Sequence, residues 1–149
     1  MKIYIASDHA GFELKAFLKS RFVDEGMRVL DLGPDDFVLE DDYPKFISKV
    51  GKEVSKDSSS RGIVIGYSGQ GEAIVSNRFP NVRCAVYYGG DKNILRLSRE
   101  HNDANILSLG AHFLDKEEAY EAVSFWLKTE FSHEARHIRR INEIEEYPN

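Results

Sequence analysis

One stretch of the chain joins an apolar run to a glycine-rich loop and then to a single acid. The run Ile63–Ile65 and Gly66 precede Glu72, with the loop residues between them, Tyr67, Ser68, Gly69, Gln70 and Gly71. A buried strand that feeds such a loop leaves backbone amides free to surround a small anionic ligand. A carboxylate beside that loop can act as a general base. The same spacing also fits a tight turn with an acid in the first turn of a helix.

The glycine spacing differs from two common nucleotide-binding motifs. No Gly-Lys-Ser/Thr follows the loop, as a P-loop requires, and Ile74 stands where a dinucleotide fingerprint has its third glycine. A nucleotide- or flavin-binding module is therefore a weak alternative, and we expect no cofactor. A cofactor-free absorbance spectrum of the purified protein would count further against it.

A carboxylate and a histidine, Asp8 and His9, follow the first apolar run of the chain. The pair fits a helix cap with an exposed histidine. It fits equally a pair that hydrogen-bonds sugar hydroxyls, and the local sequence does not choose between the two.

A second histidine, His101, stands with Asn102 at the end of a helical segment. Ile94, Leu97 and Ser98 share its helical face, so we expect His101 to point inward. It is then either a satisfied core histidine or a proton donor that faces a pocket.

The segment from 136 to 140 places Arg136 and Arg140 on one face of a helix. Two guanidinium groups at this spacing suit a phosphate, although a solvated basic face is the usual reason for such a run. Acidic residues follow at once at 143, 145 and 146, which argues against nucleic acid. The histidines at 9, 101, 112, 133 and 137 show no clear ligand spacing, so we expect no metal site.

Short apolar strands alternate with helical patterns along the chain. We expect strands at 2–7, 28–32, 62–65, 82–88 and 106–109. We expect helices around 14–26, 46–54, 71–79, 91–101, 119–127 and 134–146, the last with its isoleucines on one side, Ile138, Ile141 and Ile144.

This alternation predicts an α/β protein with a parallel sheet covered on both faces, as a doubly wound fold. If the strand order begins 2-1-3, the order in which strands are added to the sheet reverses between the first and third strands. Folds of this kind bind ligands at this switch point. The loops that carry Asp8, His9 and residues 68–72 then face each other.

Bulk composition limits the classes of protein that the chain can belong to. With 149 residues, 42% of them hydrophobic and 30% charged, it suits one globular domain over 1–149. The net charge of −5 does not favour nucleic acid or an anionic membrane, and no apolar stretch is long enough to span a bilayer. The chain has one cysteine, Cys84, and so can form no disulfide within itself. Its N-terminal apolar run is too short and is followed too early by polar residues for a signal peptide, and we therefore expect a cytoplasmic protein.

Taken together, the motifs resemble the ribose-5-phosphate isomerase B / galactose-6-phosphate isomerase family over nearly the whole chain. Five segments in order carry the resemblance: 7–15 (SDHAGFELK), 42–44 (DYP), 69–71 (GQG) with Asn77, 99–105 (REHNDAN) and 136–140 (RHIRR). The family implies a three-layer Rossmann-like sheet of five parallel strands. It also implies a homodimer, possibly paired into tetramers, whose active sites lie between subunits and whose C-terminal helix extends to the partner.

The resemblance implies an aldose–ketose isomerase that needs no metal or cofactor, with ribose 5-phosphate in the pentose phosphate pathway as the default substrate. Many members have a catalytic cysteine at the position of Gly66, and one branch uses a glutamate in the following loop instead. Glu72 matches that branch. Tyr67 stands where glycine is usual, His112 where an arginine contacts the phosphate, and the segment 87–93 is about two residues longer than the pattern.

These assignments predict a proton transfer through an enediolate. Glu72 moves the proton, the amides of 67–71 with Ser68 hold the oxyanion, and His101 with Asp8 opens the sugar ring. The phosphate is held by Arg136 and Arg140 with His9 and His112, and Asn102 and Gln70 complete the substrate contacts. The alternatives are an isomerase of a galactose or allose 6-phosphate or of a tetrose phosphate, or a non-catalytic sugar-phosphate sensor.

Overall fold

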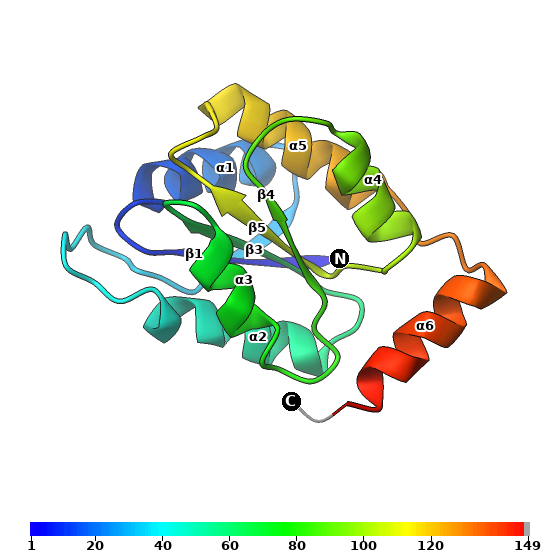
Figure 1. Cartoon of the computed structure of the whole chain (residues 1–149). Coiled ribbons are helices and arrows are strands. Elements are labelled where there is room, and N and C mark those ends of the chain that lie inside the picture. The colour runs from blue at the N-terminus through cyan, green and yellow to red at the C-terminus, as the bar shows by residue number, and fades with distance from the viewer. Residues whose placement is uncertain (148–149) are drawn as a thin grey trace.

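A single sheet of five parallel strands forms the centre of the computed structural model, which describes residues 1–147 (Figure 1). The strands run in the order β2-β1-β3-β5-β4. They are β1 (Lys2–Ser7), β2 (Arg28–Asp31), β3 (Arg61–Gly66), β4 (Cys84–Tyr87) and β5 (Ile106–Gly110). This order confirms the expected 2-1-3 arrangement and the doubly wound architecture.

Helices cover both faces of the sheet. The helices are α1 (Phe12–Asp24), α2 (Pro44–Lys56), α3 (Gln70–Ser76), α4 (Asn93–Glu100), α5 (Lys116–Lys128) and α6 (Ala135–Glu145). One core cluster joins the sheet to α1, α4 and α5, and the other joins it to α2 and α3 (Figure 1). Because β3 and β5 are covered on both sides, they are built of nearly continuous apolar residues.

The fourth strand begins two residues later than the sequence predicts. At its start, the backbone N–H groups donate to side-chain amide oxygens. The N–H of Arg83 donates to Asn105 Oδ1 at 2.8 Å, and the N–H of Cys84 donates to Asn77 Oδ1 at 2.8 Å. Regular pairing with β5 therefore begins at Cys84. Burial raises the pKa of the Cys84 thiol to about 12, which removes it as a nucleophile at neutral pH.

Helix α6 stands apart from the sheet (Figure 1). Its links to the rest of the chain include an Arg83–Glu145 ion pair at 3.0 Å and a ring stack of His137 on His101 at 4.2 Å. The expected apolar side of this helix is not covered, since Ile138 and Ile144 are 41% and 51% exposed. Within residues 1–147, no helix combines the length and the apolar character that crossing a bilayer requires.

Candidate active site

The predicted site residues fall at two opposite edges of the sheet. All strands are parallel, so every loop that leaves a strand lies at one edge, called here the carboxyl edge, and every loop that enters one lies at the other, the amino edge. Asp8 and His9 follow β1, the residues from Tyr67 to Glu72 follow β3, and His112 follows β5, so these meet at the carboxyl edge. His101 and Asn102 precede β5 and belong to the amino edge, together with Arg136 and Arg140 on α6.

Glu72 is the buried acid of the carboxyl edge. It lies in the first turn of α3 and is 4% exposed. Burial, and to a lesser degree the nearby charge of Asp8, raises the pKa of its carboxyl group above the ordinary value for glutamate. No ion pair holds this carboxylate among the residues that the structure describes. It is therefore free to accept a proton, and its raised pKa makes it a stronger base.

Gly66 leaves the room that the Glu72 carboxylate occupies. A methyl group at position 66 would lie 2.0 Å from Oε1 and 2.2 Å from Cδ of Glu72. Any side chain there must displace the acid. The carboxylate of Glu72 can therefore occupy its position only because residue 66, at the end of β3, has no side chain.

Two glycines shape the loop between β3 and α3. Gly69 has a φ of 78°, in the left-handed region that favours glycine. Its carbonyl accepts a hydrogen bond from the Ser108 hydroxyl at 2.6 Å, which fixes the loop to β5. A Cβ on Gly71 would lie 2.7 Å from the hydroxyl of Tyr43, so the start of α2 lies directly against this loop. The loop that leads to Glu72 is therefore held from β5 and from the start of α2.

Asp8 is also buried, with 6% exposure, and its Oδ1 accepts the backbone N–H of Gly11 at 3.1 Å. Burial raises the pKa of its carboxyl group, and the hydrogen bond from Gly11 partly opposes that shift. Gly11 is itself the N-cap residue of α1, and no side chain caps that helix, so Asp8 stabilises the turn that leads into α1 and does not cap the helix. Burial beside Glu72 also puts two carboxyl groups at the switch point.

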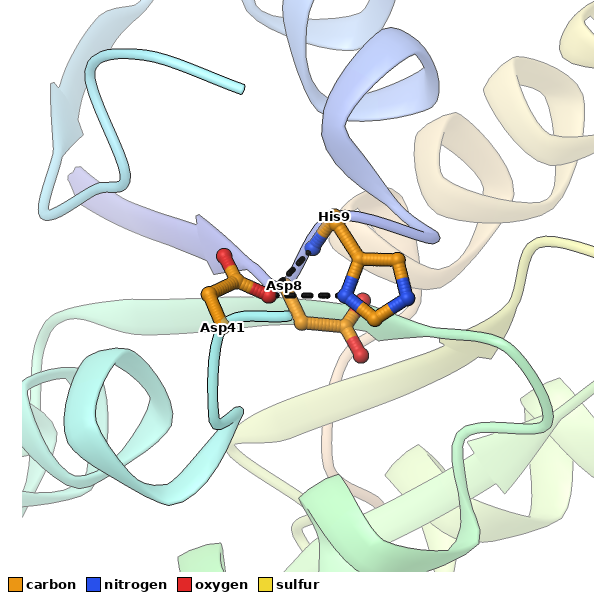
Figure 2. A group of neighbouring side chains, drawn as sticks. All are labelled: Asp8, His9 and Asp41. Atoms are coloured by element: carbon orange, nitrogen blue, oxygen red, sulfur yellow. Dashed lines mark hydrogen bonds and ion pairs between the residues drawn. The ribbon is translucent and has the colours of Figure 1, made fainter. Parts of the chain in front are cut away.

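His9 forms a pair with a residue that the sequence analysis did not select, Asp41. The Nδ1 of its ring lies 2.8 Å from Oδ1 of Asp41, and its backbone N–H donates to the same oxygen at 2.9 Å (Figure 2). Hydrogen bonding to Asp41 raises the pKa of His9. Asp41 lies in an acidic loop and 32 positions from His9, so no local pattern signals the pair. Tyr43 belongs to the DYP segment at 42–44, but the sequence does not predict its contact with Gly71.

Asp8, His9 and Asp41 each offer one possible metal-ligand atom, and these atoms lie within 4.8 Å of one another. However, Nδ1 of His9 and Oδ1 of Asp41 are already joined by a hydrogen bond. The arrangement is better described as a hydrogen-bonded pair beside a third carboxyl group than as a set of free ligands.

Tyr67 and His112 stack on each other at the carboxyl edge, with ring centroids 4.2 Å apart and an angle of 15° between the planes. Tyr67 is 55% exposed, and Phe113 meets both rings edge-on. Tyr67 and His112, which we expect to alter the wall of the pocket and the phosphate contact, are therefore in contact with each other. Ser68 lies beside them, and its hydroxyl accepts the backbone N–H of Gln70 at 3.4 Å.

The interior face of α4 differs from the expected one. Leu95, Ser98 and Arg99 are buried, whereas Ile94 is 52% exposed. The prediction that Ile94 and Leu97 mark an inward face for His101 is therefore wrong, because the helix is rotated so that Ser98 receives the indole N–H of Trp126 at 3.1 Å. His101 is half-buried and lies against His137 instead of the core.

The arginines of α6 are exposed, as the phosphate hypothesis requires, but they lie far from Glu72 in the same chain. Arg136 forms an ion pair with Glu134 at 2.9 Å, and Arg140 points to solvent on the same helix. In Figure 1, α6 lies to the right of the sheet, whereas the loops of the carboxyl edge lie to the left. One chain thus brings together Asp8, His9, Glu72 and His112 but not His101, Asn102, Arg136 and Arg140.

Residues 3–144 match the protein family described as Ribose/Galactose Isomerase. The chain is 37% identical over 147 residues to the ribose-5-phosphate isomerase B of Mycolicibacterium paratuberculosis, covering 99% of this chain and 91% of that protein. Among solved structures, the ribose-5-phosphate isomerase B of Mycoplasma genitalium with bound ribulose 5-phosphate is 35% identical, with a TM-score of 0.92 over 98% of this chain and 95% of that one. The enzyme of Clostridium thermocellum is 40% identical, with a TM-score of 0.91 over 98% and 96%.

Proposed function

The chain belongs to the ribose/galactose isomerase family, and we propose that it interconverts ribose 5-phosphate and ribulose 5-phosphate as one isomerase domain over residues 1–149. The observation that carries the mechanism is the Glu72 carboxylate, buried without a cation and seated in the room that Gly66 leaves open. A cytoplasmic setting is consistent with Cys84, a lone free thiol in the described part of the chain.

Glu72 is the base that moves the proton. It takes a proton from C2 of the open-chain aldose, and the electrons of that C–H bond form an enediolate across C1 and C2. It then returns the proton to C1, while the hydroxyl proton of O2 passes to O1, which leaves the ketose. A positioned base of this kind contributes about 10²–10⁴-fold to the rate.

The loop after β3 stabilises the oxygen that gains charge. Backbone N–H groups between Tyr67 and Gly71, with the Ser68 hydroxyl, belong to the loop that leads from β3 to Glu72 and are the donors that we assign to this role. Donors fixed in advance around an oxyanion contribute about 10²–10³-fold each, because they need no reorganisation during the reaction. Ser108 and Tyr43 support this loop from β5 and from α2.

The complete site requires a second copy of the chain. The two groups of site residues lie at opposite edges of one protomer, and α6 leaves Ile138 and Ile144 exposed. In a two-fold dimer, His101, Asn102, Arg136 and Arg140 of one subunit would face Glu72 and His9 of the other. His101 would then assist ring opening opposite Asp8, and the arginines would hold the phosphate with His9 and His112.

Coexpression of two inactive variants tests this shared site. We expect Glu72→Gln and the double variant Arg136→Ala/Arg140→Ala each to have little activity at ribose 5-phosphate concentrations well below the wild-type KM. With random pairing, half of the dimers are mixed, and each mixed dimer has one site in which both Glu72 and the two arginines are unaltered. About a quarter of all sites should then be intact, so activity should reach about a quarter of the wild-type value. Each variant expressed alone gives the baseline. Activity that stays at this baseline would place the whole site within one chain.

The substrate is tested with a panel of aldose phosphates in deuterated water, followed by NMR. We expect ribose 5-phosphate to take up deuterium at C2 and to yield ribulose 5-phosphate, and we expect slower exchange with allose or galactose 6-phosphate and with a tetrose phosphate. Faster turnover of a six-carbon or four-carbon substrate would reassign the substrate. Binding without any exchange would identify a sugar-phosphate sensor instead.

A further inference from the structure

We propose that Asp41 is a positioning residue that holds His9 as an imidazolium with Nε2 directed at the phosphate of the substrate. The proposal deepens the proposed function and rests on it for the identity of the ligand. It gives the carboxyl edge a positive charge on His9, in addition to the arginines of the amino edge, Arg136 and Arg140.

The geometry fixes the imidazole ring from one side. A single oxygen, Oδ1 of Asp41, accepts both the backbone N–H of His9 at 2.9 Å and Nδ1 at 2.8 Å. Two contacts from one residue to one atom restrict both the backbone and the ring orientation of His9. Nε2 lies on the side of the ring turned away from Asp41 (Figure 2). The side chain of His9 keeps 33% exposure, so a ligand can reach it.

Burial of Asp41 argues for the charged form of the pair. Its side chain is 7% exposed, and its second oxygen, Oδ2, is buried without a hydrogen-bond partner among residues 1–147. A carboxylate removed from water in this way is destabilised unless a positive charge lies beside it. His9 is the group in contact with it that can supply this charge, by retaining protons on both ring nitrogens.

The other charged groups around His9 do not replace Asp41. Asp8 precedes it in the chain, while Glu13 on α1 and Asp115 and Lys116 at the start of α5 line the hollow that His9 shares with them. Lys116 is 3.6 Å from Glu13, so these two charges largely offset each other. The pKa of His9 is raised chiefly through its hydrogen bond to Asp41, with burial opposing and Asp8 adding to the shift.

The ligand that suits this arrangement is a phosphate rather than a sugar hydroxyl. A fixed imidazolium presents one strong N–H donor with a positive charge, and such charge-assisted bonds to phosphate are about twice as strong as neutral ones. His112, also at the carboxyl edge, is stacked on Tyr67 and has no acidic partner among the described residues. His9 is therefore the histidine of this edge that an acidic partner holds in the charged form.

The first experiment follows the protonation of His9 in the free, full-length protein. NMR titration of the ring protons, with His9 assigned from the spectrum of His9→Gln, should give a pKa above 6.5 in the wild type. We expect Asp41→Asn to lower it by about one pH unit, because the amide keeps the hydrogen-bond acceptor and removes the charge. Glu40→Gln is the matched control, since it removes a neighbouring exposed charge of the same loop. Equal pKa values in wild type and Asp41→Asn would overturn the proposal.

The second experiment separates positioning from a purely structural role. At pH 7.5 we expect Asp41→Asn to raise the KM for ribose 5-phosphate about tenfold and to change kcat only a few-fold. The KM difference should shrink as the pH falls and His9 regains its proton, which a misfolded loop would not do. A KM ratio that is the same from pH 5.5 to 8 would overturn the proposal.

Inorganic phosphate gives a readout without turnover. Its dissociation constant should rise in Asp41→Asn by a similar factor and with the same pH dependence, while Glu40→Gln should match the wild type. A wild-type protein that binds phosphate with this pattern but isomerises no sugar phosphate would refute the proposed function and leave the Asp41–His9 assignment standing. Phosphate affinity that does not depend on Asp41 would refute the assignment alone.

Discussion

We expect Glu72→Gln to lower the kcat of ribose 5-phosphate isomerisation by about 10²–10⁴-fold, because the substitution removes the general base. The amide is nearly isosteric with the carboxylate but cannot accept the proton from C2. Because the proposed site assigns the phosphate and hydroxyl contacts to other residues, KM should change only a few-fold. The measurement is steady-state kinetics together with deuterium exchange at C2.

Glu53→Gln on α2 is the control for this change, since Glu53 is an exposed acid that forms an ion pair with Lys56 away from the site. It should leave both kcat and KM at wild-type values. Near-wild-type turnover by Glu72→Gln would remove Glu72 from the role of base and would direct attention to Asp8, the other buried carboxyl group at this edge.

The pH dependence of the wild-type enzyme should carry the same signature. A base acts in its ionised form, and burial raises the pKa of Glu72 above the ordinary value of 4.5. As the pH falls, kcat/KM should therefore begin to drop at a higher pH than an exposed glutamate would give. This acidic limb should be lost from the residual activity of Glu72→Gln.

The sheet and its switch point were predictable from sequence because their signals are local. Apolar runs such as Ile63–Ile65 specify buried parallel strands, and the polar residues after them must then lie at one edge. That reasoning places Asp8 beside the loop of Glu72, as the structure confirms. The glycine-rich loop could likewise be read directly, since Gly69 adopts a backbone conformation that other residues avoid.

The parts that sequence reasoning missed depend on contacts between distant segments. Asp41 reaches His9 from a loop without regular structure, so no periodicity connects the two. The rotation of α4 is set by Ser98 meeting Trp126 of α5, and the apolar pattern around His101 could not show it. Helix α6 leaves Ile138 and Ile144 exposed, and amphipathic spacing alone cannot show whether the rest of the same chain covers the apolar side of a helix.

Gly66→Ala should be as informative as removing the base, because it alters the position of Glu72 without altering its chemistry. The new methyl group would lie 2.0, 2.2 and 2.6 Å from Oε1, Cδ and Oε2 of Glu72. These are the end atoms of a flexible side chain, so the carboxylate should swing away while the fold stays intact. Displacing a catalytic group by about 1 Å can cost about 10²-fold, and we expect kcat to fall by at least that factor.

Thermal unfolding distinguishes this effect from a packing defect. Gly66→Ala should keep a Tm close to that of the wild type, whereas Gly62→Ala should lower it, because a methyl group there meets Val50 and Ile106 in the core at 2.7 and 2.8 Å. The double variant Gly66→Ala/Glu72→Gln should be no slower than Glu72→Gln, since the methyl group acts only through the acid. If the two losses multiplied instead, Gly66 would serve the reaction independently of Glu72, and the open space at the end of β3 would belong to the substrate rather than to the base.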